Sequence, residues 1–139
     1  MHMITYPARI DEAGPNDFVV QFVDVPEALT GGATREAAWA GAGDVLAAAI
    51  ETYLELDRAI PPPRPAGPGE TDVALDPTIA ARVELRRLMA EQGVTGRNLA
   101  QRLGKDEKAV RRMLAGEGAS LGATLQALKV LGARPALAF

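Results

Sequence analysis

The stretch VVQFVDVPEALTGGATREAAWAGAGDVLAAA, residues 19–49, predicts a strand, a tight turn and then a helix. The β-branched and aromatic residues at its start favour a strand, and the glycine pair that follows favours a turn. Thr34 is a suitable helix N-cap, and Glu36 falls in the first turn, where the helix dipole favours an acidic side chain. Apolar residues then recur at three- and four-residue steps from Trp39 to Tyr53. We therefore expect a sheet with one helix packed on a single face.

The segments that precede this stretch complete the predicted sheet. MITYPAR (residues 3–9) and DFVVQFVDV (17–25) are typical of strands, and DEAGPND (11–17) supplies turn residues between them. An antiparallel pair is expected, with ALTGGA (28–33) as the candidate for a short third strand.

The composition is that of an ordinary globular protein, since 47% of the 139 residues are hydrophobic and 24% are charged. The chain has no cysteine, which excludes disulfides and thiolate metal sites and fits a reducing compartment. No apolar run approaches the ~18 residues of a membrane span, and the start lacks the pattern of a signal peptide. A cytoplasmic location is expected.

Charge is distributed unevenly along the chain. Residues 1–57 carry two basic and ten acidic side chains, a net charge of −8, whereas residues 71–139 carry eleven basic and seven acidic ones, a net charge of +4. An acidic half attracts a basic partner, and a basic half attracts nucleic acid. The polarity therefore predicts two partners of opposite charge.

A proline-rich segment, AIPPPRPAGPGE (residues 59–70), separates the two halves. Five of the ten prolines lie in it, and proline fixes φ and removes an amide donor. A semi-rigid polyproline-II spacer is expected, with a proline-rich docking motif as the alternative. The predicted domains are residues 1–57, a linker at 58–71, and residues 72–139.

The third segment predicts four helices. Caps precede each of them, namely Asp76 with Pro77, Thr95, Asp106 and Ser120. Glycines follow the helices and are expected to end them. RPALAF (residues 134–139) is short and apolar, and so is a possible final strand.

The spacing in LAQRLGKDEKAVRRMLAG (residues 99–116) is typical of a helix-turn-helix, with residues 106–115 as the helix expected in the major groove. A small helical bundle without DNA-binding activity is the alternative. Basic side chains on the exposed side of this region favour the first interpretation. The candidate DNA-binding residues are Arg97, Asn98, Lys105, Glu107, Lys108, Arg111 and Arg112.

The pieces LRRLMAEQGVT (85–95), LAQRLG (99–104), AVRRMLAG (109–116) and LQALKVLG (125–132) together resemble the Cro/repressor-type (Xre-like) DNA-binding domain. The chain departs from that pattern at Gly96, where glutamine is usual, and at two acidic residues of the expected recognition helix, Asp106 and Glu107. The resemblance implies operator binding as a dimer. ARPALAF (133–139) and TDVALD (71–76) are candidates for an interchain sheet, and pairing within one chain is the alternative.

The chain offers few catalytic side chains. His2 is the only histidine and Ser120 the only serine, so nucleophile–histidine pairs are nearly excluded. A metal-dependent ribonuclease would need several carboxylates converging on cations, and the acidic residues are instead spread over a turn and a helix face. No enzyme activity, metal or cofactor is expected.

Residues 6–57 resemble the N-terminal domain of HicB-type antitoxins. The residues that carry the resemblance are Tyr6, Pro7, Ala8, Phe22, Asp24, Pro26, Thr30, Gly32, Thr34, Glu36, Ala37, Tyr53 and Leu54, with departures at Val23, Glu27 and Ala28. The resemblance implies a degenerate ribonuclease H-like fold without catalytic carboxylates, and a HicA-type mRNA interferase as the bound toxin. The candidate toxin-binding residues are Asp24, Glu27, Asp44, Glu51 and Glu55.

The fold class expected is therefore α+β, with a degenerate ribonuclease H-like sheet followed by an all-α helix-turn-helix domain. The function expected is an antitoxin that blocks its toxin and represses its own operon. A stand-alone repressor with a ligand-sensing N-terminal domain is the alternative.

Overall fold

The computed structural model describes residues 4–117 and 121–133. The chain forms two compact units. The sheet unit consists of residues 4–53 and 59–76, and the helical unit contains residues 54–58 and the described residues from Pro77 onward. The proline-rich segment, expected as a semi-rigid spacer between two domains, is thus part of the sheet unit.

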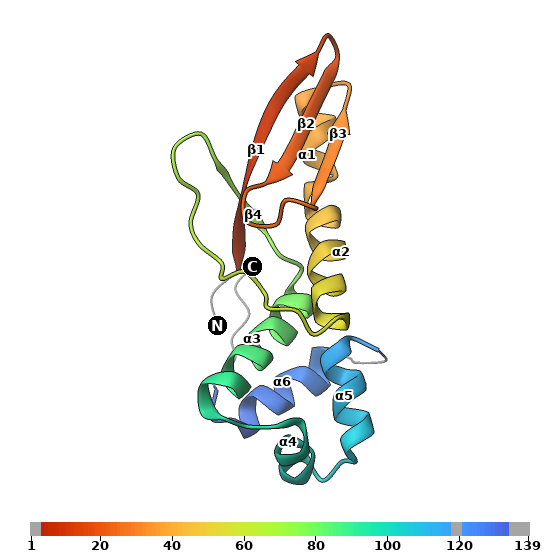
Figure 1. Cartoon of the computed structure of the whole chain (residues 1–139), viewed down its shortest axis with the longest axis vertical. Coiled ribbons are helices and arrows are strands. Elements are labelled where there is room, and N and C mark those ends of the chain that lie inside the picture. The colour runs from red at the N-terminus through yellow and green to blue at the C-terminus, as the bar shows by residue number, and fades with distance from the viewer. Residues whose placement is uncertain (1–3, 118–120, 134–139) are drawn as a thin grey trace. The chain divides into compact units, whose positions relative to one another are not determined.

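The sheet unit is built on a four-stranded antiparallel sheet (Figure 1). Its strands, in the spatial order β3-β2-β1-β4, are β1 (Thr5–Gly14), β2 (Asp17–Phe22), β3 (Leu29–Gly32) and β4 (Thr71–Ala74). The expected antiparallel pair and the short third strand are confirmed. The connection between β1 and β2 is shorter than the predicted seven-residue turn, because β1 continues to Gly14 and Asn16 makes the turn with a φ of 56°.

Strand β4 follows the proline-rich segment and returns the chain to β1. Tyr6 lies opposite Val73, and the Leu75 N–H donates to the Ile4 carbonyl at 2.9 Å. Of the two pairings left open for residues 71–74, the structure contains the one within a single chain. The predicted linker boundary at residue 71 therefore differs from the structure, where Thr71 begins a strand.

Two helices, rather than the one expected, follow β3. Helix α1 spans Arg35–Ala40 and helix α2 spans Ala42–Glu55, with Gly41 between them. A Cβ at Gly41 would lie only 2.9 Å from Thr30 Oγ1 on β3. The prediction of a single helix was wrong because Gly41, a poor helix former, lies where the chain passes close to the sheet.

The core of the sheet unit lies on the sheet face that carries alternate residues of β1 and β2. Tyr6, Ala8, Val20 and Phe22 are at most 1% exposed, which follows from the period-two alternation of a strand. Helix α1 packs against β2 and β3, and α2 adds a buried row to the core. The members of that row are Ala42, Leu46, Ile50 and Tyr53.

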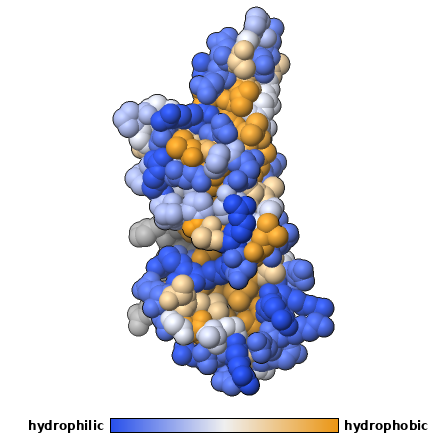
Figure 2. All heavy atoms as spheres, in the orientation of Figure 1, coloured by the Kyte–Doolittle hydropathy of each residue, from blue (hydrophilic) through white to orange (hydrophobic). Residues whose placement is uncertain are grey.

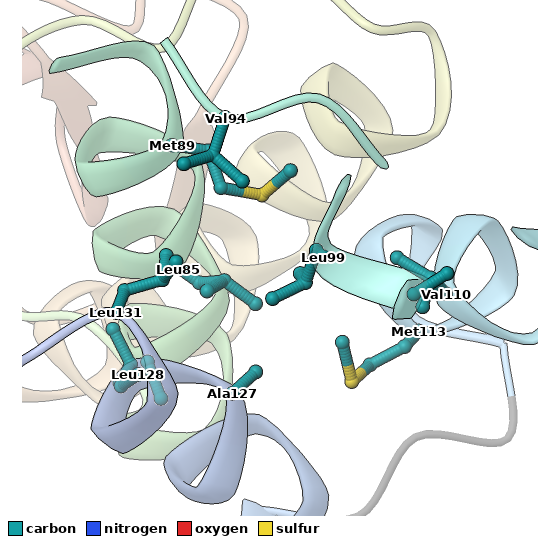
Figure 3. Close-up of a cluster of buried hydrophobic side chains, with 11 residues drawn as sticks. Leu85, Met89, Val94, Leu99, Val110, Met113, Ala127, Leu128 and Leu131 are labelled. Carbon is teal, nitrogen blue, oxygen red and sulfur yellow. The ribbon is translucent and has the colours of Figure 1, made fainter. Parts of the chain in front are cut away.

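The helical unit contains α3 (Pro77–Gln92), α4 (Gly96–Leu103), α5 (Glu107–Ala115) and α6 (Leu121–Val130). The four helices share one buried cluster, to which α3 contributes Leu85, α4 Leu99, α5 Val110 and α6 Leu128 (Figure 3). The predicted cap Ser120 and the possible strand at residues 134–139 lie outside the described residues.

Candidate functional site

Helices α4 and α5 are fixed by capping bonds within the helical unit. Thr95 begins α4 with a capping box, in which the Asn98 N–H donates to Thr95 Oγ1 at 3.1 Å and Asn98 Oδ1 accepts from the Thr95 N–H at 3.4 Å. Asp106 begins α5, and its Oδ1 accepts from the Ala109 N–H at 2.7 Å. The predictions of both caps are confirmed. Asn98 is therefore used in the cap, although its side chain is exposed.

A short turn joins these two helices. Gly104 ends α4 with a φ of 67°, a left-handed conformation that favours glycine, and the Lys105 N–H donates to the Ala100 carbonyl at 3.0 Å. Leu99 and Val110 are fully buried, and in Figure 3 Leu99 points from α4 toward the centre of the cluster. The inner faces of α4 and α5 are thus held in the core, and their opposite faces are left to solvent.

The outer faces of α4 and α5, and the turn between them, carry the basic residues. The exposed cations are Arg97, Arg102, Lys105, Lys108, Arg111 and Arg112, and Glu107 is exposed beside them. Among the residues that the structure describes, none of these six cations forms an ion pair. Figure 2 shows hydrophilic residues covering this part of the molecule. The α4–α5 face therefore presents uncompensated positive charge.

Helix α3 differs, because its arginines Arg86 and Arg87 form ion pairs. The Arg87 guanidinium donates to Glu84, one turn earlier on the same helix, and to Glu91 at 2.6 Å. The proximity of Glu84, followed by that of Glu91, raises the pKa of Arg87. Arg86 is paired with Asp57. Among the described residues of the helical unit, most of the exposed cations without an ion pair thus lie on α4, α5 and the turn between them, and Lys129 on α6 is a further one.

Sequence reasoning missed Arg102 as a member of this face. Arg102 lies in the last turn of α4, next to the turn that leads to Lys105. Its position in LAQRLG is the signal that could have found it. Arg102 comes three residues after the buried Leu99 and directly before the partly buried Leu103.

In the sheet unit, Asp24 belongs to a network of ion pairs. Arg64 Nε lies 2.8 Å from Asp24 Oδ2, and Arg64 Nη1 lies 3.0 Å from Glu70 Oε1. Arg9 Nη2 lies 3.2 Å from the other oxygen of Glu70. The Arg64 hydrogen bonds, followed by one from the Gly67 N–H, lower the pKa of Glu70 to about 2. The ion pairs of Arg64 with Asp24 and of Glu70 with Arg9 therefore attach the proline-rich segment to the rest of the sheet unit.

Two tyrosines extend these internal contacts. The Tyr6 hydroxyl donates to the Pro61 carbonyl at 2.7 Å, and burial, with the nearby charge of Asp24, raises the pKa of Tyr6 to about 12. The Tyr53 hydroxyl donates to Glu27. Asp24 and Glu27, two of the predicted toxin-binding residues, thus also have partners inside the sheet unit.

The three other predicted toxin-binding residues lie on α2. Asp44, Glu51 and Glu55 are all exposed there. Their spacing of seven and four residues puts them on one stripe of the helix. The structure therefore separates the predicted acidic set into a pair engaged near the end of β2 and a row along α2.

The glycine-rich loop has a packing role. A Cβ at Gly32 would lie 2.7 Å from the Ala38 amide nitrogen and 2.8 Å from the Ala37 Cβ. Thr34 caps α1 by accepting from the Ala37 N–H at 3.1 Å. Gly32 thus allows α1 to approach β3 closely, and the predicted cap at Thr34 is confirmed.

Within residues 4–117 and 121–133, no three acidic or histidine side chains come together in an arrangement that could hold a metal ion. His2 and Ser120 lie outside those ranges. No helix in the described part of the chain is both long and apolar enough to cross a membrane.

Comparison with known proteins places the chain in a family of bacterial antitoxins. Residues 5–84 match the family described as HicB_like antitoxin of bacterial toxin-antitoxin system. The chain is 37% identical over 130 residues to Antitoxin HicB 2 of Photorhabdus laumondii, covering 91% of this chain and 90% of that protein. It is 32% identical over 108 residues to Antitoxin HicB of Escherichia coli K12, covering 78% of each chain. The chain belongs to the HicB-like antitoxin family.

Proposed function

We propose that the chain is an antitoxin that binds and blocks a HicA-type mRNA interferase and represses its own operon by binding operator DNA. Family membership supports a toxin as partner. The separation of charge supports one partner for each half of the sequence, since the acidic side chains gather in residues 1–57 and the basic ones in residues 71–139. Both activities belong to the cytoplasm, where mRNA and the operon are accessible.

The proposed toxin-binding surface is the acidic row of α2, together with Asp24 and Glu27. A toxin that cleaves RNA has a cationic active site, so an acidic protein surface competes with its substrate for the same charges. Asp44 and Glu55 are the strongest candidates, because both are exposed and neither forms an ion pair or hydrogen bond among the described residues. The ribonuclease H-like ancestry of the sheet stays a prediction, and the proposal does not depend on it.

The proposed DNA-binding surface is a helix-turn-helix formed by α4 and α5. The observation that carries it is a set of six exposed cations on α4, on α5 and in the turn between them, none of which forms an ion pair with a described residue. Lys108 and Arg112 are one turn apart on α5 and are proposed to reach base edges, while Lys105 at the turn is proposed to contact phosphate. Binding as a homodimer would place two such helices on two half-sites.

The proposed antitoxin activity is tested by co-expressing the chain with the small basic protein encoded by the reading frame adjacent to the gene. We expect rescue of growth and a complex on gel filtration, and weaker complex formation with Asp44→Lys than with the control Glu12→Lys on β1. Failure of rescue together with the absence of a complex would refute the toxin assignment.

DNA binding is tested with a duplex taken from the region upstream of the gene. Each phosphate contact releases counterions, so Lys105→Ala should reduce the salt dependence of binding by about one ion. Lys108→Ala and Arg112→Ala should also reduce discrimination against a scrambled duplex. Equal binding to both duplexes by the unmodified chain would refute operator recognition.

A further inference from the structure

Arg82 is a buried arginine in the middle of the helical unit. It lies in the second turn of α3 and is only 5% exposed, whereas arginine side chains are almost never fully buried unless they are paired. It is not part of the α4–α5 face that carries the exposed cations. Its location therefore calls for a role other than direct contact with DNA.

The Arg82 guanidinium lies against the C-terminal end of α5. A Cβ at Gly116 would overlap Arg82 Nη1, and would lie 2.8 Å from Cζ and 3.3 Å from Nη2. Gly116 is the C-cap of α5, has a φ of 87°, and donates its N–H to carbonyls of the last turn. The absence of a side chain at residue 116 thus makes room for the guanidinium.

The charges at this contact are complementary. The last carbonyls of a helix carry a partial negative charge, which a nearby cation stabilises. The last turn of α5 carries Arg112 and Met113, whose carbonyls accept the cap bonds. A cation supplied from α3 therefore stabilises the end of α5 from the inside of the unit, while the Arg112 side chain is exposed to solvent.

We infer that Arg82 is a positioning residue that fixes the C-terminal end of α5 relative to α3, and so sets the angle at which α5 meets DNA. This inference rests on the proposed DNA binding by α5. Base contacts are directional, so a small rotation of α5 would misalign Lys108 and Arg112 with base edges. Contacts with phosphate depend mainly on charge and would be affected less.

Direct contact between Arg82 and Gly116 is tested by a double-mutant cycle. Gly116→Ala and Arg82→Ala are measured singly and together by urea unfolding of the helices, and the matched control is Gly104→Ala. Gly104 is also a left-handed C-cap, with a φ of 67°, but a Cβ at this residue would have no neighbour within 4 Å. We expect Gly116→Ala to be coupled to Arg82→Ala by roughly fivefold or more in the unfolding equilibrium constant, and Gly104→Ala to be additive with it. Additivity in both pairs would overturn the contact.

The positioning role is tested with Arg82→Met, which keeps much of the length of the side chain and removes its charge. Operator affinity should fall about tenfold, while affinity for a scrambled duplex and helical content stay unchanged. Arg87→Met, at an exposed position of the same helix, should leave both affinities unchanged. A merely structural defect would lower both affinities together and would overturn the inference.

Two further outcomes separate this inference from the proposed function. Failure of the unmodified chain to bind its upstream duplex would overturn DNA binding, and the positioning role with it. Normal binding by the unmodified chain and equal binding by folded Arg82→Met would overturn the positioning role alone. If Arg82→Met does not fold, folded Arg82→Lys replaces it, with reduced operator discrimination as the supporting result and unchanged discrimination as the contrary one.

Discussion

The N-cap of α5 gives a prediction that distinguishes two contributions of Asp106 to stability, its capping hydrogen bond and its negative charge. Asp106 is exposed, and its Oδ1 accepts from the Ala109 N–H at 2.7 Å. Asp106→Ala removes that acceptor, which costs about 1 kcal/mol for a typical N-cap. It also removes a negative charge from the positive end of the helix dipole, worth a further ~0.3–1 kcal/mol. We therefore expect a loss of about 1–2 kcal/mol in the free energy of unfolding of the helical unit.

Asp106→Asn is the matched control, because asparagine keeps the acceptor and loses only the charge. Its loss of stability should be limited to the charge contribution of ~0.3–1 kcal/mol, smaller than that of Asp106→Ala, since asparagine and aspartate rank equally as N-caps. Its affinity for DNA should be equal or higher, because a negative charge beside the proposed interface is gone. The two substitutions together distinguish a capping role from a charge effect.

The assay can use the chain's own chromophores. Trp39 is the only tryptophan and lies in α1 of the sheet unit, and both tyrosines, Tyr6 and Tyr53, are in that unit as well. Urea unfolding followed by far-UV circular dichroism reports the helices, and Trp39 fluorescence serves as an internal control that should not shift. A loss for Asp106→Asn as large as that for Asp106→Ala would refute the capping argument.

Two further predictions concern the sheet unit, and Trp39 fluorescence reports both. Gly32→Ala should destabilise this unit by about 1–3 kcal/mol, because the new Cβ would press against the Ala38 amide, whereas Gly43→Ala, whose Cβ would meet nothing within 4 Å, should stabilise it by about 0.5–1 kcal/mol. A loss of stability in both variants would contradict this packing explanation. For Glu70, the folded-state pKa of about 2 lies below its ordinary value of 4.5, so its stabilising contribution is present above pH 4.5 and is lost as the pH falls toward 2. In Glu70→Gln the acid dependence of unfolding over that interval should become shallower, and an unchanged dependence would contradict the role of the Arg64 contact.

The sequence by itself predicted the features that depend on neighbouring residues. The caps at Thr34, Thr95 and Asp106 were found because the cap and the amide it binds are three residues apart. The antiparallel pair of β1 and β2 was found for a similar reason, since a short turn brings alternating apolar residues together. Family membership also followed from motifs along the chain and agrees with the comparisons.

The tertiary structure decided the features that depend on residues far apart in the chain. Arg64 meets Asp24 across 40 positions, and the Tyr6 hydroxyl meets Pro61 across 55, so composition indicated a spacer where the chain packs on its own sheet. The pairing of β4 with β1, the break at Gly41 and the contact of Arg82 with Gly116 have the same origin. Local propensity sets where an element begins and ends, but the partner of a strand edge or a buried charge is chosen only when distant parts of the chain compete for the same space.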